Sequence, residues 1–512
     1  MSDAADDLRC RLLQLQSCFT WDLKEEQLEL DDLSRQLQHD IELQLGQPGA
    51  EAHACRFLAY VRYLQGQPEE ALSLLNQSEE KTRESYGEED ERRLIVTYGD
   101  LAWLRYHRGD FTQSRTFCQR VHDILVKHPL GSSSDLHPEV YGEKGWTFLK
   151  FSKFYYPRAI ECFKRALELQ PNDCEWNAGY AIALFRTEPN DLKIHHEESP
   201  ATKQLRRAVE INPDDGVLLS MLALKLVLYQ KHREAEGLVE RALEVGPDDP
   251  QVIRYVAKFL RKQDQLDRSI DLLQRVMRRS SQSAFIHHQL ALCYKRKKNN
   301  LISKRPKPER EVQHWRRLCI QNLEEAVRLK TGLNLAKADL ALQYAEESDG
   351  RSDPRLRRAQ RMFDEVLETV EDETWSIRQS ICRCYAEFCH YHSIQKDCAV
   401  SYYMKALEFR PDTSEARHCA KKLRLMAERR LRNDRGDAAA YGILGDVAKA
   451  EGDRRMAVRY YEKALQRDAD NEHFLSALLE LRLLLQEEKE EKEEDQEEPP
   501  QSGTGDRKSS GT

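Results

Sequence analysis

Basic side chains recur at helical spacing in the middle of the chain, where they could bind phosphate groups. Arg254, Lys258 and Arg261 stand at i, i+4 and i+7, so they share one face if the segment is helical. Further basic, amide or aromatic side chains take comparable positions: Trp146, Phe148, Phe151, Tyr156, Tyr180, Arg186, Tyr255, His288, Gln289, Lys295 and Arg296. Guanidinium and ammonium groups bind phosphates, and rings stack on unpaired bases. This pattern suits single-stranded nucleic acid, and a basic groove of this kind is equally able to bind an acidic peptide terminus.

Motifs of catalysis are absent from the sequence. It contains no G-x-x-x-x-G-K-[ST], no G-x-S-x-G, no H-E-x-x-H and no EF-hand loop. A group at Cys382, Cys384, Cys389, His390 and His392 has the residue types of a zinc site. On a helix, however, Cys382 and Cys384 point about 200° apart, which favours buried free thiols. We therefore predict a binding protein that is not an enzyme and requires no cofactor.

A repeated pattern of small and large residues must position these side chains. Ala159, Phe163, Ala166 and Pro171 follow one another at intervals of four, three and five. The pattern recurs at Ala201-Leu205-Ala208-Pro213, Ala235-Val239-Ala242-Pro247, Ala399-Tyr403-Ala406-Pro411 and Ala457-Tyr461-Ala464-Ala469. Small residues let paired helices approach closely, and proline ends the second helix. The spacing predicts tetratricopeptide repeats, hence an all-α superhelical solenoid of about eight to ten helix pairs with inserted helices.

Composition divides the chain into five predicted segments. They are an N-terminal helical cap at 1–48, N-terminal repeats at 49–250, central repeats at 251–413, a basic helix with a C-terminal repeat at 414–485, and a disordered acidic tail at 486–512. Within the central repeats, a basic insertion at 295–317 is expected to form an exposed loop, with guidance of flanking RNA or a nuclear signal as alternatives.

The net charge does not exclude nucleic acid as a ligand. The chain has 80 Lys+Arg and 88 Asp+Glu, a net charge of -8. Nine acidic residues and two lysines between Glu487 and Glu498 account for -7 of it, so the remainder carries about -1. The 13 cysteines are odd in number, the start lacks a secretory signal, and no run of apolar residues is long enough to span a bilayer. We expect a cytoplasmic protein without membrane contact.

Longer sequence blocks resemble the interferon-induced proteins with tetratricopeptide repeats, over roughly residues 11–480. The blocks are Ser17-Cys18-Phe19-Thr20-Trp21, residues 57–72, Gly145-Trp146 with Leu149-Lys150, Ala178–Ile182 with Arg186, Leu222–Leu226, Arg254–Phe259, and His287-His288-Gln289 with Leu292–Tyr294. These blocks are far more specific than the general repeat spacing.

The resemblance implies an antiviral effector of innate immunity. RNA-binding members hold the 5′ end of single-stranded viral RNA, bearing a triphosphate or an incompletely methylated cap, in a basic groove and sequester it or block its translation. By motif position, Lys150 and Arg186 look like contacts to the terminal phosphates, and Trp146 matches an aromatic wall of cap-binding members. The implied contacts to the following nucleotides, with one further aromatic candidate, are Arg254, Tyr255, Lys258, His288, Gln289 and Tyr156.

Two positions depart from the family pattern and leave alternatives open. Gln36 and Asp40 stand where triphosphate-binding members carry Thr or Arg and then Gln. Asp40 would repel phosphates unless a divalent cation such as Mg²⁺ bridges them, with Asp32 as a metal ligand. Cap, triphosphate and monophosphate ends all stay open. The alternative function is a scaffold that binds related tetratricopeptide-repeat proteins or signalling proteins without recognising RNA ends.

Overall fold

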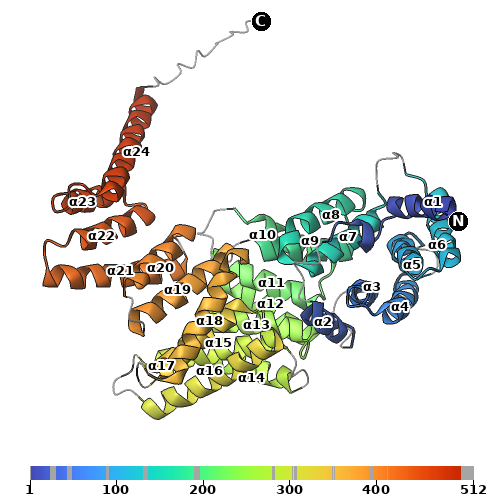
Figure 1. Cartoon of the computed structure of the whole chain (residues 1–512), viewed down its shortest axis with the longest axis horizontal. Coiled ribbons are helices and arrows are strands. Elements are labelled where there is room, and N and C mark those ends of the chain that lie inside the picture. Colours follow the sequence, from blue (N-terminus) through green and yellow to red (C-terminus); the bar gives the residue numbers. More distant parts are fainter. Residues whose placement is uncertain are drawn as a thin grey trace, which may run out of the picture. The chain divides into compact units, whose positions relative to one another are not determined.

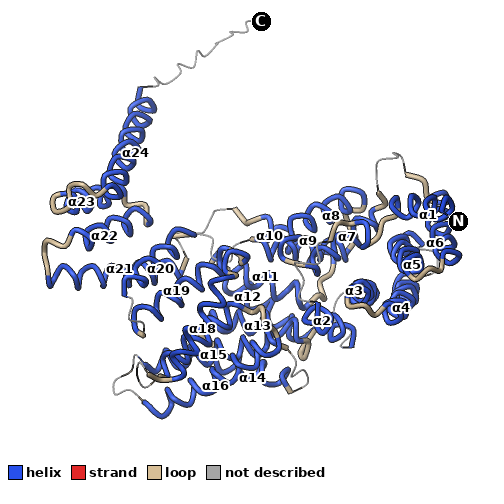
Figure 2. The backbone as a smooth tube through the Cα atoms, in the orientation of Figure 1, coloured by secondary structure: helices blue, strands red, loops and turns tan. Residues whose placement is uncertain are grey.

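A computed structural model describes residues 2–23, 30–42, 49–87, 91–130, 136–188, 197–278, 283–302, 304, 308–348, 350, 352–392, 396–411 and 413–497. Within these residues the regular elements are twenty-four α-helices and short 3-10 turns, and no strand occurs (Figures 1 and 2). The chain forms two compact units, Met1–Ala336 and Lys337–Thr512. We call them the N-terminal unit and the C-terminal unit and describe each by itself.

The N-terminal unit consists of two entry helices and seven consecutive helix pairs. The entry helices are α1 (Ser2–Gln14) and α2 (Leu30–Glu42). The pairs are α3 (Ala50–Leu64) with α4 (Pro68–Tyr86), α5 (Ile95–His107) with α6 (Phe111–Lys127), α7 (Pro138–Phe151) with α8 (Tyr156–Leu169), α9 (Cys174–Thr187) with α10 (Pro200–Ile211), α11 (Gly216–Leu226) with α12 (His232–Val245), α13 (Pro250–Lys262) with α14 (Leu266–Met277), and α15 (Ala284–Ile302) with α16 (Glu309–Leu329).

The C-terminal unit adds three pairs and two single helices. The pairs are α17 (Asn334–Glu347) with α18 (Pro354–Glu368), α19 (Trp375–Tyr391) with α20 (Lys396–Phe409), and α22 (Ala438–Ala450) with α23 (Arg454–Leu465). The single helices are α21 (Ser414–Asn433), which is the predicted extra basic helix, and α24 (Glu472–Glu497), which ends the described chain. The ten pairs in the described residues agree with the number that the repeat spacing predicts.

The repeated small and large residues form the contacts between helices. The two alanines and the large residue of all five pattern copies are exposed by 2% or less. The ring of Phe163 fills the space beside Gly145 and Gly179, since a Cβ atom built on Gly179 would lie only 2.4 Å from the ring. The close approach of helices at small residues is therefore the one that the spacing predicted.

Aspartates start several of the first helices. Asp173 accepts a hydrogen bond from the backbone N–H of Trp176, and Asp215 and Asp249 cap α11 and α13 in the same way. Each aspartate follows the end of the preceding helix by a few residues, so one short turn both ends a pair and begins the next. The turn thereby fixes the direction in which successive first helices stack.

The basic insertion differs from the predicted loop. Residues 295–302 continue α15, and residues 309–317 begin α16, so most of the insertion extends a helical hairpin. Its sequence contains no glycine, and Pro308 lies directly before the first residue of α16. Lys, Arg, Glu and Gln are good helix formers, and proline is tolerated at a helix start, so the segment has no reason to break the helices.

The predicted disordered tail also begins as helix. The α24 backbone continues to Glu497, and residues 498–512 lie outside the described residues. Glutamate and lysine have high helix propensity, and Glu/Lys pairs four apart, such as 488 with 492, favour the helix. The helix ends two residues before Pro499, whose ring disfavours helical geometry in the residue that precedes it.

Candidate nucleic-acid interface

The first helices of successive pairs form one continuous layer in the N-terminal unit. α7 contacts α9, α9 contacts α11, α11 contacts α13, and α13 contacts α15. Figure 1 shows these helices following one another through the unit. Nearly all predicted site residues lie on this layer, and Tyr156 is the first residue of α8. The layer thus brings together side chains that are far apart in the sequence.

Arg186 lies at the centre of the candidate site. Its Nη1 donates a hydrogen bond of 3.3 Å to the carbonyl of Leu149, the residue before Lys150. Its guanidinium carbon lies 5.8 Å from the ring centre of Tyr156. Burial by itself would lower the pKa of Arg186, but interactions with the hydroxyls of Tyr156 and Tyr255 outweigh it, so the pKa is raised. Arg186 is therefore charged and held from α7, α8 and α13 at once.

Arg254 contacts the hydroxyl of the same tyrosine. Its Nη2 donates a hydrogen bond to the Tyr255 hydroxyl, and its guanidinium lies 4.8 Å from the ring centre of Phe285. Burial raises the pKa of Tyr255, but the charges of Arg254 and Arg186 outweigh burial and the pKa is lowered. One phenol thus holds two guanidinium groups near each other, a concentration of positive charge that an anion would stabilise.

The remaining residues of the stripe connect α13 with α15. Arg261 Nη2 donates a hydrogen bond of 3.1 Å to the side-chain oxygen of Gln289. Lys258 is half-buried one turn after Arg254, and His288 is 6% exposed beside Gln289. The structure therefore places the predicted residues of α13 and α15 on adjacent helices and links the two helices directly.

Trp146 keeps one polar group without a partner. Its ring packs edge-on against Phe163, with ring centres 5.4 Å apart, and lies 6.2 Å from the ring of His53. The indole side chain is half-buried, and Nε1 has no hydrogen-bond acceptor within the described chain. A buried indole N–H usually finds an acceptor, so a ligand oxygen or nitrogen could supply it.

Buried carboxylates close to Trp146 are neutralised by cations. His53 contacts Glu143 at 2.8 Å and also binds Glu175, while Arg56 binds Glu143 at 2.7 Å and Arg93 binds Glu175 at 3.2 Å. Burial would lower the pKa of His53, but the two carboxylates raise it to about 9. The cluster therefore holds its charges in pairs, which limits its repulsion of phosphates.

Lys150 projects from the end of α7 and is half-buried. Burial raises the pKa of the Cys55 thiol to about 11, and the positive charge of Lys150 is one of the influences that oppose this rise. Because Leu149 binds Arg186, the α7 end carrying Lys150 and the α9 end carrying Arg186 lie together. The two predicted terminal-phosphate contacts thus lie in one region.

Three residues of this region were missed by reasoning from the sequence. Phe185 packs edge-on against Tyr255, with ring centres 5.8 Å apart, and Phe285 lies beside Arg254. Lys225 is fully buried, pairs with Glu188 at 2.8 Å, and lies 5.4 Å from the Phe185 ring centre. In the sequence, the feature that could have identified Phe185 as a site residue is its position directly before Arg186. The charge of Lys225 is paired with Glu188, so Lys225 helps to hold the Phe185 ring in place and does not bind a ligand.

The departures from the family pattern lie on α2. Gln36 is exposed there, whereas the side chains of Asp32 and Asp40 lie outside the described residues. The neighbouring Asp31 accepts a hydrogen bond of 2.8 Å from the Gln65 amide. The metal ligand Asp32 and the repulsive role of Asp40 therefore stay predictions.

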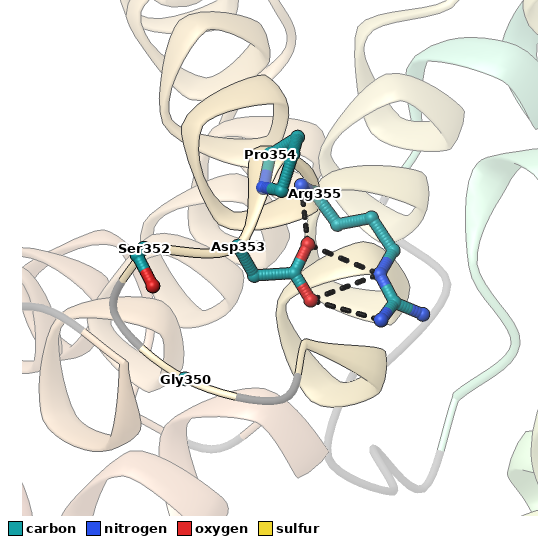
Figure 3. A pocket seen from close by; sticks show the side chains of 5 residues that line it. All are labelled: Gly350, Ser352, Asp353, Pro354 and Arg355. Carbon is teal, nitrogen blue, oxygen red and sulfur yellow. Dashed lines mark hydrogen bonds and ion pairs between the residues drawn. The ribbon is translucent and has the colours of Figure 1, made fainter.

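A cavity of about 500 Å³ lies elsewhere, in the C-terminal unit. Its lining residues are Gly350, Ser352, Asp353, Pro354 and Arg355 (Figure 3). Asp353 caps α18 and holds the Arg355 guanidinium at 2.8 Å, so both charges are already paired. The cavity contains none of the predicted site residues and offers a ligand no unpaired charge among those that line it.

Stacked helix pairs that bury small and large residues at repeated positions define a tetratricopeptide-repeat protein. The profile of the tetratricopeptide repeat matches residues 438–471. The chain is 32% identical over 484 residues to human "Antiviral innate immune response effector IFIT1", covering 92% of this chain and 99% of the relative. It is 29% identical over 484 residues to human "Interferon-induced protein with tetratricopeptide repeats 2", covering 92% of this chain and 96% of that relative.

Solved structures agree with these relatives. "Human IFIT1 dimer with m7Gppp-AAAA" has a TM-score of 0.75 and 30% identity, covering 90% of this chain and 100% of the other. "Human IFIT1 dimer with PPP-AAAA" has a TM-score of 0.72 and 30% identity with the same coverage. The chain belongs to the family of interferon-induced proteins with tetratricopeptide repeats, as its sequence blocks predicted. Across the described helices, none is long and apolar enough to cross a membrane.

Proposed function

We propose that this protein captures the 5′ end of single-stranded RNA on the first-helix layer of the N-terminal unit. The observation that carries the proposal is the pair of guanidinium groups, Arg186 and Arg254, held by the hydroxyl of Tyr255 beside Lys150. Human IFIT1, which shares 30% identity and this fold, has been solved with a triphosphate-ended and with a capped oligoribonucleotide.

The chemistry of capture follows from the side chains of the layer. Lys150 and Arg186 would bind the terminal phosphates by charge-assisted hydrogen bonds, and Arg254 and Lys258 would bind the next phosphates. Phe285 offers a ring beside Arg254, and Trp146 offers a ring and an N–H donor for a terminal base. Gln289, which accepts from Arg261, and His288 complete the contacts along α15.

Binding alone would be sufficient for an antiviral effect. A protein that sequesters the 5′ end prevents its use in translation, so the proposal assigns no catalytic step and no required cofactor. Mg²⁺ held with Asp32 at the phosphates would relieve the repulsion from Asp40 and belongs to the proposal only for a triphosphate end. The proposed compartment is the cytoplasm, where translation occurs.

A binding experiment with matched variants tests the proposal. Fluorescence anisotropy would compare one RNA sequence bearing a triphosphate, a monophosphate, a hydroxyl or an unmethylated cap at its 5′ end. We expect Lys150→Glu/Arg186→Glu to abolish discrimination among these ends while far-ultraviolet circular dichroism stays unchanged. Lys164→Glu/Arg233→Glu makes the same charge change at exposed positions of second helices and should leave binding near wild type. Undiminished binding by the first variant would disprove the proposal.

The scaffold alternative makes a different prediction for the same variant. If the protein acts by assembling related proteins, partner capture should survive both ribonuclease treatment and Lys150→Glu/Arg186→Glu. If RNA capture is the function, the antiviral effect in infected cells should disappear with this variant. The two outcomes distinguish an RNA-binding effector from a protein scaffold.

A further inference from the structure

Two cysteine thiols face each other between α19 and α20, which pack side by side as a helix pair (Figure 1). Cys389 lies in the last turn of α19, and Cys398 lies in the first turn of α20. Both are free thiols, and their Sγ atoms are 3.0 Å apart. A disulfide bond is about 2.05 Å long, so the two sulfurs need to approach by only about 1 Å to form one.

The helical backbone divides the group of cysteines that the sequence places close together. Cys384 contacts Asp339 of α17 at 3.6 Å and accepts a hydrogen bond of 3.3 Å from Arg383. Cys389 follows five residues later and contacts α20 instead. The fold therefore separates Cys389 from its neighbours in sequence and pairs it with a thiol of the next helix.

Aromatic packing holds the two sulfurs in place. The Tyr385 hydroxyl interacts with the thiols of both Cys389 and Cys398. The Tyr385 ring packs edge-on against Tyr402 of α20, with ring centres 4.6 Å apart, and lies 5.2 Å from the ring centre of Phe363 on α18. The proximity of the thiols is thus fixed by side chains of three helices.

The two thiols differ in their access to solvent. Cys389 is 1% exposed, and burial raises the pKa of its thiol to about 12, so it stays protonated near neutral pH. Cys398 is only partly buried, so a small oxidant can reach its sulfur. An accessible cysteine beside a second thiol that can resolve its oxidised form is the usual arrangement in redox-sensitive proteins.

We propose that Cys398 and Cys389 are a modification site at which a peroxide forms a reversible disulfide. The Cys398 thiolate attacks one oxygen of the peroxide, the O–O bond breaks, and the other oxygen takes up a proton and leaves as water or an alcohol. The Cys389 sulfur then attacks the resulting sulfenic acid. The S–S bond forms, the S–O bond breaks, and the hydroxyl leaves as water with the Cys389 proton.

The electrons and the reversal of this reaction are both accounted for. The two sulfurs give two electrons to the peroxide, and an excess of a thiol reductant restores both thiols by thiol–disulfide exchange. The bond encloses the eight residues between the two cysteines and ties the end of α19 to the start of α20. Helix ends open more readily than helix centres, so the bond slows local opening of this pair.

Peptide mapping of the full chain after mild treatment with hydrogen peroxide tests the site. Trypsin cleaves after Arg383, Lys396 and Lys405, so the disulfide joins peptide 384–396 to peptide 397–405. We expect the joined peptides in wild type and their loss on adding a thiol reductant. Cys389→Ser and Cys398→Ser should each abolish them. The matched control Cys384→Ser, which changes the other cysteine of the same peptide, should retain them.

Three results would overturn the proposal. They are a wild type that yields no joined peptides, joined peptides that persist in Cys389→Ser, and joined peptides that disappear in Cys384→Ser. The last two would assign the bond to Cys384.

A trapping experiment tests the order of the two steps. Dimedone, which reacts with sulfenic acids, should label Cys398 in the Cys389→Ser variant after peroxide treatment and should not label Cys389 in Cys398→Ser. The opposite labelling would show that Cys389 is oxidised first and contradict the assigned roles.

Amide hydrogen exchange tests the effect of the bond on the helix pair. Peptides covering the end of α19 and the start of α20 should exchange at least about threefold more slowly in oxidised than in reduced wild type. Peroxide-treated Cys398→Ser should exchange like its reduced form. Equal exchange in oxidised and reduced wild type would show that the bond does not restrain the pair.

Discussion

Tyr255 is the residue that organises the candidate site, because its hydroxyl is shared by two guanidinium groups. The ring is 7% exposed and packs against Phe185, so its position is fixed by the core. The hydroxyl, in contrast, contributes only to the placement of Arg186 and Arg254. Hydroxyl and ring therefore have separable roles, one in binding and one in packing.

The variant Tyr255→Phe is expected to separate these roles. It keeps the packed ring and removes the hydroxyl, so the melting temperature should change little while affinity for 5′-triphosphate RNA falls roughly tenfold, about 1.4 kcal/mol. Anisotropy titration and a thermal melt measure the two effects. Tyr441→Phe, whose hydroxyl makes only a long contact with the Arg435 carbonyl, is the matched control and should bind RNA as wild type does.

His53 should make stability depend on pH in the alkaline range. Its pKa is about 9 in the folded protein and 6.5 in a model peptide, so the stabilisation is fully present below 6.5 and is lost as pH rises through 9. The ionised Glu143 and Glu175 do not titrate in this window, because their pKa values are lowered, although burial alone would raise them. The loss should be on the order of 3 kcal/mol.

Chemical denaturation at pH 6.5 and pH 9 measures this effect. The wild-type free energy of unfolding should fall by more than that of His53→Gln, which lacks the titrating group. His473→Gln removes an exposed histidine that contacts Asp446 and should retain the wild-type pH dependence. Equal pH dependence of wild type and His53→Gln would show that His53 is not held in its charged form.

At the scale of the element, close helix contacts depend on positions that lack a Cβ atom. On α9, Gly179→Ala would place a Cβ 2.4 Å from the Phe163 ring and force the two helices apart. We expect a loss of about 1–3 kcal/mol of stability. On α12, Gly237→Ala meets no atom within 4 Å and should stabilise the protein by about 0.5–1 kcal/mol, since alanine favours the helix. Both variants make the same chemical change. Thermal melts should give a melting temperature below that of wild type for Gly179→Ala and above it for Gly237→Ala.

At the scale of the whole molecule, the candidate interface should show a salt dependence that the net charge of -8 does not suggest. Four cations, Lys150, Arg186, Arg254 and Lys258, are proposed to contact phosphates. Each contact to single-stranded RNA contributes about 0.7 to the slope of log affinity against log salt, so the slope should be roughly -3 between ~50 and ~200 mM salt.

Removing one of the four cations should change this slope in a defined way. Lys150→Gln is expected to make the slope shallower by about 0.7 as well as weaken binding, because one fewer counterion is released. Lys164→Gln, an exposed change on the second helix α8, should leave the slope unaltered. A wild-type slope near zero would indicate that phosphates are not the groups recognised.

The sequence by itself determined the repeat and the residues of its contacts. Spacings of three, four and five residues decide which side chains share a helix face and where a pair ends, so the buried small and large positions of the repeat were predictable. The family was predictable from the longer sequence blocks. The predicted loop at 295–317 and the predicted disorder at 487–497 were wrong, because the charged residues of these segments favour helix.

Only the tertiary structure decided which side chains meet across the layer. The contact of Arg186 with Tyr255 and the position of His53 between Glu143 and Glu175 both depend on how neighbouring pairs stack. Stacking is set by the packing of many residues distant in sequence, and no local spacing encodes it. The periodicity therefore specified which helices form, while the arrangement of helix pairs specified the site.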